Sequence, residues 1–215
     1  MHDKEFRYVD KLVAAGNFAK AFEKCWYKWN TYGKFKWAQK LCEVLELSGA
    51  IDESKRFREK LATLNITDDQ FFENLDKMER LYTLQEWKCV EEKLIQDMRG
   101  RGYTPSNCSE RYHRFLARKG AVDEIYNICL AQPQLIDNYF ELLRPRYEKE
   151  LSNLFERHVL RVASRSTLSK YKETCELFKK YSKLGVDISS PLAKVRKWHR
   201  NRPTLMEMLD DLRLD

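Results

Sequence analysis

"GAIDES", at Gly49–Ser54, is almost repeated as "GAVDEI" at Gly120–Ile125, further along the chain. Each copy contains a glycine, an alanine, a β-branched apolar residue and an Asp-Glu pair. Glycine enters the left-handed backbone region just past a helix end without the steric penalty of a Cβ atom. An Asp-Glu pair favours the first turn of the next helix, whose dipole is positive there. The two copies therefore predict equivalent helix–turn–helix points and do not indicate an active site.

The spacing of the glycines extends this pattern. Gly16, Gly33 and Gly49 recur at nearly equal intervals, and a looser copy of the motif begins at Gly16. Between them, apolar residues recur at steps of three and four, as in helices that bury one face. No segment of five or more residues alternates convincingly between apolar and polar residues, so we expect no strands. The sequence predicts an all-α fold of antiparallel helical hairpins, each about 33 residues long.

This unit resembles the tetratricopeptide repeat, whose length is about 34 residues. The resemblance covers residues 1–65 and 110–131; no unit has the complete Trp, Leu-Gly, Tyr, Ala and Pro pattern, and the unit around Thr83–Trp87 lacks its glycine. Residues 98–129 also resemble one pentatricopeptide unit, but a single unit cannot form a base-reading array. The tetratricopeptide resemblance implies an α-solenoid that presents a long curved surface to a partner.

The predicted organisation has three parts. Residues 1–99 are expected to form the hairpins, residues 100–107 a polar connecting loop, and residues 108–215 a divergent C-terminal helical bundle with a basic face and an acidic final helix. Thr67 and Gln70 have the form of a capping box. Arg144-Pro145 is expected to end a short helix, and Ser190-Pro191 to cap and begin another.

The end of the chain resembles a known family. Residues 199–209, "HRNRPTLMEML", are similar to the C-terminal helical region of bacterial SWIM zinc-finger proteins, which tends to end in His-Arg-x-Arg-Pro-x-Leu-x-x-x-Leu. The zinc finger itself is absent, because the chain contains no Cys-x-Cys and no Cys-x-His. The resemblance implies a helical tail that binds a partner near nucleic acid, without zinc-finger chemistry.

We expect no metal, no cofactor and no catalytic centre. Cys108 and His113 have a zinc-ligand spacing, but no second pair accompanies them. The sequence contains neither a phosphate-binding glycine loop nor a Gly-x-Ser-x-Gly elbow. His158 lies on an apolar stripe and is expected to be an interior histidine with its hydrogen bonds satisfied. Four further thiols lie on or beside apolar stripes and are expected to be buried: Cys25, Cys42, Cys129 and Cys175.

The expected location is the cytoplasm. No apolar run approaches the roughly 18 residues that span a bilayer, and the charged start of the chain does not resemble a secretory signal. Six scattered cysteines are typical of a reducing compartment, where they remain thiols. We therefore expect no membrane partner.

Two groups of residues are candidates for binding. In "KCWYKWNTYGKFKW" (Lys24–Trp37), lysines alternate with aromatic residues, as in proteins that stack bases and neutralise phosphates. The alternative is that Trp26 and Trp29 face the hairpin interior while lysine chains cover the ring edges. The candidate aromatic and basic contacts are Lys24, Tyr27, Lys28, Tyr32, Lys34 and Lys36.

The second group is the basic segment 157–202, which holds 13 Lys/Arg against 3 Asp/Glu, a net charge of +10. Such charges usually form a solvated face, but this excess is larger than solubility requires. The partner is either an acidic protein or a nucleic acid. The candidate residues, expected to be exposed, are Lys172, Lys179, Lys183, Lys194, Arg196, Lys197, Arg200 and Arg202.

Together these observations favour a non-enzymatic scaffold or adaptor that recognises a protein partner within a nucleic-acid-associated complex. The alternative is a single-stranded nucleic-acid-binding protein that uses the basic C-terminal face and residues 24–37. Salt dependence separates the two hypotheses, because phosphate neutralisation makes nucleic-acid affinity fall steeply with salt.

Overall fold

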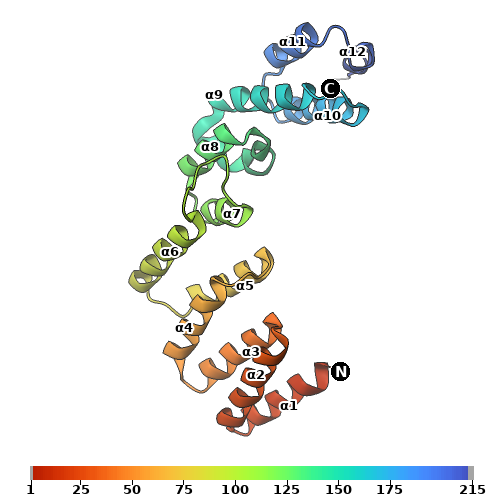
Figure 1. The fold of residues 1–215 in the computed structure, drawn as a ribbon. Helices are drawn as coiled ribbons and strands as arrows, with labels where there is room; N and C mark the ends of the chain where they lie inside the picture. Colours follow the sequence, from red (N-terminus) through yellow and green to blue (C-terminus); the bar gives the residue numbers. More distant parts are fainter. Residues whose placement is uncertain (1, 213–215) are drawn as a thin grey trace. The chain divides into compact units, whose positions relative to one another are not determined.

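The prediction of an all-α fold is confirmed. A computed structural model describes residues 2–212, and this part of the chain contains twelve α-helices, one short 3₁₀ helix and no β-strand (Figure 1). The chain divides into two compact units, residues 1–100 (unit 1) and 101–215 (unit 2). The division falls at the start of a non-helical stretch, residues 100–109.

Unit 1 contains six helices at regular intervals. Helices α3 and α5 begin at residues 35 and 68, and helices α2, α4 and α6 begin at residues 18, 51 and 84. The interval within each series is constant and close to the tetratricopeptide length of about 34 residues. Successive helices from α1 to α5 pack against each other (Figure 1). Their bounds are α1 His2–Ala14, α2 Phe18–Tyr32, α3 Phe35–Leu47, α4 Ile51–Ala62, α5 Asp68–Glu79 and α6 Leu84–Arg99.

The two similar motifs form the same turn, as the sequence predicts. Gly49 (φ 83°) and Gly120 (φ 68°) are both in the left-handed region. In each turn the glycine N–H donates to the carbonyl three residues earlier, and the next N–H donates to the carbonyl five residues earlier, with N···O distances of 2.9–3.1 Å. This is the Schellman helix ending. The Asp-Glu pair then lies in the first turn of the following helix in both copies.

Where the glycine is missing, a different cap begins the helix. Tyr82 occupies the position that corresponds to Gly49 in the next hairpin. Thr83 and Glu86 form a capping box there, with the Thr83 N–H donating to Glu86 Oε2 at 2.7 Å. The capping box at Thr67 and Gln70 is confirmed. Side-chain caps therefore begin α5 and α6, where the glycine is absent.

The core of unit 1 begins between its first three helices. Val9 of α1, Cys25 of α2 and Leu41 of α3 are buried in one apolar cluster. The rings of Phe6 and Trp37 stack with their centroids 4.2 Å apart, which joins α1 to α3. A second cluster places Leu61 of α4 against α3. The apolar residues of α1, α2, α3 and α4 thus cover one another.

Unit 2 is organised around the long helix α9. Helix α9 packs against α8, α10 and α11. The Phe155 ring stacks on Tyr181 with centroids 4.5 Å apart, and its edge-on contact with Phe178 has a centroid distance of 5.7 Å. The elements are α7 Glu110–Arg118, α8 Val122–Ala131, η1 Pro133–Leu135, α9 Ile136–Ala163, α10 Leu168–Lys183, α11 Ser189–Trp198 and α12 Pro203–Asp210.

Of two helix boundaries predicted in unit 2, the one at Arg144-Pro145 is confirmed to within two residues and the one at Ser190 is wrong. Helix α9 consists of two helical segments separated by a kink at Tyr147, where the backbone is non-helical (φ −122°, ψ 27°), two residues after Pro145. Helix α11 begins at Ser189, one residue before the predicted Ser190 cap, and the Asp187 carboxylate accepts from the Ser189 N–H at 2.9 Å. The N-cap position of α11 is Ile188, which makes no side-chain cap hydrogen bond.

Candidate partner-binding groove

Unit 1 contains a groove of about 780 Å³. Helix α1 contributes two residues, the loop before α3 and the first three turns of α3 contribute most of the rest, and the loop before α5 and the first turn of α5 complete the lining. The odd-numbered helices therefore supply most of this surface. The lining residues are Phe6, Asp10, Gly33, Lys34, Phe35, Lys36, Trp37, Gln39, Lys40, Glu43, Asn65, Ile66 and Gln70.

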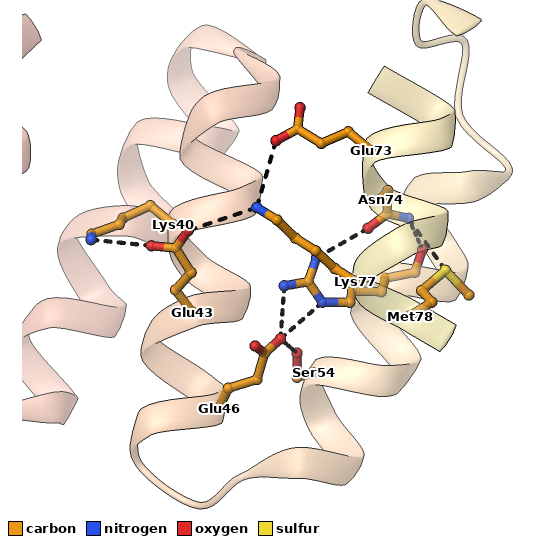
Figure 2. A network of polar contacts seen from close by, with 9 residues as sticks. Lys40, Glu43, Glu46, Ser54, Glu73, Asn74, Lys77 and Met78 are labelled. Atoms are coloured by element: carbon orange, nitrogen blue, oxygen red, sulfur yellow. Dashed lines mark hydrogen bonds and ion pairs between the residues drawn. The ribbon is translucent and has the colours of Figure 1, made fainter. Parts of the chain in front are cut away.

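Ion pairs fix the border of the groove. The Lys40 ammonium lies 2.6 Å from Asp10 Oδ1 and 3.1 Å from Glu43 Oε2, which connects α1 to α3. Burial by itself would lower the pKa of Lys40, but its hydrogen bonds to the two carboxylates raise it. Lys77 of α5 reaches Glu43 at 3.8 Å and Glu73 at 3.6 Å (Figure 2). The charges of Lys40 and Lys77 are thus already paired.

Gln39 is the anomalous member of the lining. It lies between the fully buried Trp37–Ala38 pair and Leu41, only 9% of its surface is exposed, and its Nε2 has no hydrogen-bond partner. More than nine in ten buried polar groups are hydrogen-bonded. An unpaired buried amide costs about 1–3 kcal/mol. A position on an apolar stripe is thus occupied by a polar group whose hydrogen-bonding capacity is unused inside the chain.

A buried network joins the second hairpin to α5 (Figure 2). Arg58 of α4 has no exposed surface, and its Nε and Nη2 both donate to Glu46 Oε1 of α3, at 2.8 and 2.7 Å. Its Nη1 donates to Asn74 Oδ1 of α5 at 3.2 Å, and Asn74 Nδ2 donates back to the Arg58 carbonyl at 2.9 Å. Ser54 donates to the same Glu46 oxygen at 2.7 Å. This network holds α3 and α5, two of the groove helices, in one arrangement.

The lysine–aromatic stretch does not form one site. Lys24 and Lys28 both pair with Glu5, at 3.6 and 2.5 Å. Tyr27 and Tyr32 are 60% and 53% exposed, and the Lys28 ammonium lies 4.9 Å from the centre of the Tyr32 ring. The other two candidates, Lys34 and Lys36, line the groove instead.

The tryptophans of residues 24–37 largely agree with the alternative interpretation, in which they face the protein interior, because they pack against the helices of unit 1. Trp37 is 1% exposed and stacks on Phe6. The Trp29 ring meets Phe57 of α4 edge-on, with centroids 6.3 Å apart. Trp26 is 42% exposed, and its ring lies 6.1 Å from the same Phe57. These rings serve mainly the packing of α2, α3 and α4.

The basic face separates into two groups. One group makes intramolecular contacts: Lys179 pairs with Glu176 at 3.3 Å, Lys194 with Glu156 at 2.5 Å, and Arg196 with Asp210 at 2.5 Å. The other group is exposed and makes no ion pair with any described residue; its members are Lys172, Lys183, Lys197 and Arg200. Only this second group is available to an anionic partner without breaking an internal contact.

Arg202 also has a structural contact. Its guanidinium donates to the backbone carbonyls of Ala163 (2.7 Å) and Ser164 (3.2 Å), at the C-terminal end of α9. Leu205 and Leu209, further on in the same motif, are buried. The segment on which the family resemblance rests therefore attaches α12 to the rest of unit 2, since a cation at a helix C-terminus is favourable.

Sequence reasoning missed a partly buried polar cluster around Asp137. This carboxylate accepts hydrogen bonds from Lys180 Nζ (2.8 Å) and the Tyr181 hydroxyl (2.7 Å), and the His158 Nε2 lies 3.3 Å from its other oxygen. Burial would raise the pKa of Asp137, but these hydrogen bonds hold it well below its usual range. The most distant partner, Tyr181, lies 44 residues from Asp137 in the sequence, so no local spacing marks the cluster.

The sequence predicts hydrogen-bond partners for the ring nitrogens of His158, but only one of the two nitrogens has a polar partner. Its Nε2 faces Asp137, but its Nδ1 is buried without a hydrogen-bond partner. His113, the other buried histidine, is satisfied by the Tyr139 hydroxyl at 2.6 Å from its Nδ1. The prediction of buried thiols is confirmed for Cys25, Cys42, Cys129 and Cys175.

No candidate metal site is found among the described residues, because no group of three or more His, Cys, Asp and Glu side chains is arranged to hold a metal ion. No helix between residues 2 and 212 combines the length and apolar composition needed to cross a bilayer. Comparisons with family models, with curated proteins and with solved structures found no match to this chain.

Proposed function

We propose that helices α1–α5 of unit 1 form an array of tetratricopeptide-like hairpins and that the groove of this array binds an extended segment of a protein partner. The constant interval between equivalent helices supports the repeat. In an array of hairpins, equivalent helices line one face, and the groove is lined mainly by α1, α3 and the start of α5. The chain would then act as a non-enzymatic scaffold.

The unpaired amide of Gln39 carries this proposal. An extended peptide offers a carbonyl and an N–H at each residue, and a glutamine amide can donate to one and accept from the other. Gln39 Nε2 has less than 1 Å² of accessible surface, so a bound segment would supply its missing partner after the side chain turns toward the groove. Phe6 provides an apolar surface nearby, and the exposed Lys36 would favour an acidic side chain. The expected ligand is thus an extended segment with apolar and acidic residues.

Peptide selection tests this proposal. A displayed library of random peptides is selected on the full chain, and enriched peptides are titrated against the parent and two variants. Gln39→Met is expected to weaken binding about tenfold, because a bound carbonyl loses its donor. Lys88→Glu, at an exposed position of α6 outside the groove, is the control and is expected to leave affinity unchanged. The proposal fails if no sequence is enriched or if Gln39→Met binds the peptides as tightly as the parent.

A second candidate function is weak binding of single-stranded nucleic acid. The four exposed cations without internal ion pairs favour it: Lys172, Lys183, Lys197 and Arg200. Four phosphate contacts would give a slope of about −3 in the logarithm of affinity against the logarithm of salt concentration. Changing all four residues to glutamine spares the internal contacts of Lys194, Arg196 and Arg202. Loss of oligonucleotide binding in this variant would support the candidate, and absence of binding by the parent at low salt would eliminate it.

A further inference from the structure

The end of α11 carries an exposed tryptophan. Trp198 is the last residue of this helix, and 58% of its surface is exposed, more than for any other tryptophan of the chain. Its ring makes no stacking or cation–π contact with a described residue. A tryptophan side chain stabilises a fold mainly by burying its large apolar surface. Most of the ring of Trp198 therefore contributes little to folding and remains available to a ligand.

Two cations lie beside Trp198 in the sequence. Lys197 and Arg200 are both exposed, and neither forms an ion pair with a described residue. No acidic residue occurs between Asp187 and Glu207, a stretch that contains five Lys/Arg. The local charge therefore favours an anionic ligand, and the exposed ring offers that ligand a flat apolar surface.

Internal contacts hold this segment in place on both sides of the ring. They are Lys194 with Glu156 of α9, Arg196 with Asp210 of α12, and Arg202 with the carbonyls of Ala163 and Ser164. Val195, one turn before Trp198, has no exposed surface. Some cations of the segment thus fix its backbone, and those nearest to Trp198 remain free. A ring on a fixed backbone loses little conformational entropy when a ligand binds, which favours affinity.

We infer that single-stranded nucleic acid binds at this end of α11, with one base stacked on Trp198 and with phosphates contacting Lys197 and Arg200. Aromatic rings beside cations bind single strands because every base has a flat π face and every phosphate needs positive charge. The inference rests on the second candidate function and adds to it a contact that does not depend on charge. It is independent of the groove of unit 1.

Two strands with the same number of phosphates separate stacking from charge. The full chain is titrated at low salt with a labelled oligothymidylate of about 12 nucleotides and with a strand of equal length in which each base is replaced by hydrogen. We expect the oligothymidylate to bind about tenfold more tightly, because only this strand can stack. Equal affinities would overturn the inference and leave the second candidate function intact, whereas no binding of either strand would eliminate both.

An acidic peptide is the third ligand of the test, because it would match the cations without offering a base. Oligoglutamate with as many charges as the oligothymidylate is expected to bind no more tightly than the strand without bases. If oligoglutamate binds as tightly as the oligothymidylate, the inference fails and this segment is assigned to an acidic protein partner.

Variants assign the two contributions to residues. Trp198→Ala is expected to lower the affinity for oligothymidylate about tenfold, to that of the strand without bases, and to leave the salt slope unchanged. Arg200→Gln is expected to weaken both strands and to reduce the slope by about 0.7. Tyr8→Ala, at a 52% exposed aromatic position of α1, is the control and is expected to change neither affinity. An equal loss for both strands in Trp198→Ala would refute stacking. All three positions are exposed, so none of these variants depends on the tolerance of the core.

Discussion

Replacing Gln39 with methionine is expected to stabilise the protein while it weakens ligand binding in the groove. Methionine has a similar length and adapts readily to an irregular site. The change removes a buried Nε2 that has no hydrogen-bond partner and leaves the stacked Phe6 and Trp37 in place. A gain in stability combined with a loss of binding would indicate that the polar group is retained for the ligand.

The size of the effect follows from two opposing contributions. Removing an unpaired buried amide is worth about 1–3 kcal/mol. A volume-conserving exchange costs less than about 1.5 kcal/mol through imperfect packing. The expected net change is about 1 kcal/mol of added stability, which raises the Tm of a chain of this size by about 2–4 °C.

Urea unfolding followed by tryptophan fluorescence measures this change. Four of the five tryptophans, at positions 26, 29, 37 and 87, lie in unit 1, so the signal reports mainly on the unit that contains the groove. Gln96→Met, at an exposed position of α6, is the matched control and is expected to change stability by less than about 0.5 kcal/mol. A loss of about 1 kcal/mol or more in Gln39→Met, with the control unchanged, would show that the amide is satisfied and would remove the main support for the groove.

Two further predictions concern the polar networks of the two units. Arg58→Met should destabilise unit 1 by about 3 kcal/mol, because Glu46 and Asn74 lose their buried partner. The control, Arg56→Met at an exposed position of the same helix, should have little effect. Equal urea midpoints for the two variants would contradict this prediction. The depressed pKa of Asp137 contributes stability at pH values above its usual range near 4, and this contribution is lost progressively as pH falls below that range. The stability difference between the parent and Asp137→Asn should therefore be full at neutral pH and shrink as pH falls below about 4, and a difference independent of pH would contradict the role of this charge.

The local rules of helix formation were sufficient to predict much of the architecture from the sequence. Glycine endings, acidic first turns and the Thr67 capping box depend on residues within one turn of each other, and the structure contains all three. The break predicted at Pro145 lies two residues later, at Tyr147, where the backbone leaves the helical region. The error concerns Ser190, because α11 begins one residue earlier, at Ser189, whose N–H donates to the Asp187 carboxylate.

The candidate sites were much less predictable, because they depend on contacts between distant helices. The sequence marks Lys194, Arg196 and Arg202 as basic and near the end of the chain. It does not show that their partners are Glu156, Asp210 and the last carbonyls of α9. The +10 charge of residues 157–202 thus combines cations that hold unit 2 together with cations that remain available at its surface. The net charge alone therefore overestimates the number of cations that are available to bind nucleic acid.

Gln39 combines burial with a hydrogen-bonding group that the chain itself does not use. Its Nε2 has no hydrogen-bond partner and less than 1 Å² of accessible surface, although the residue lines the groove. Because an unpaired buried polar group costs about 1–3 kcal/mol, a chain without a use for it would gain stability by substitution. A ligand that draws the amide toward the groove would give this group a use, whereas a defect of packing would not. The opposite effects expected of Gln39→Met on stability and on binding distinguish these two explanations.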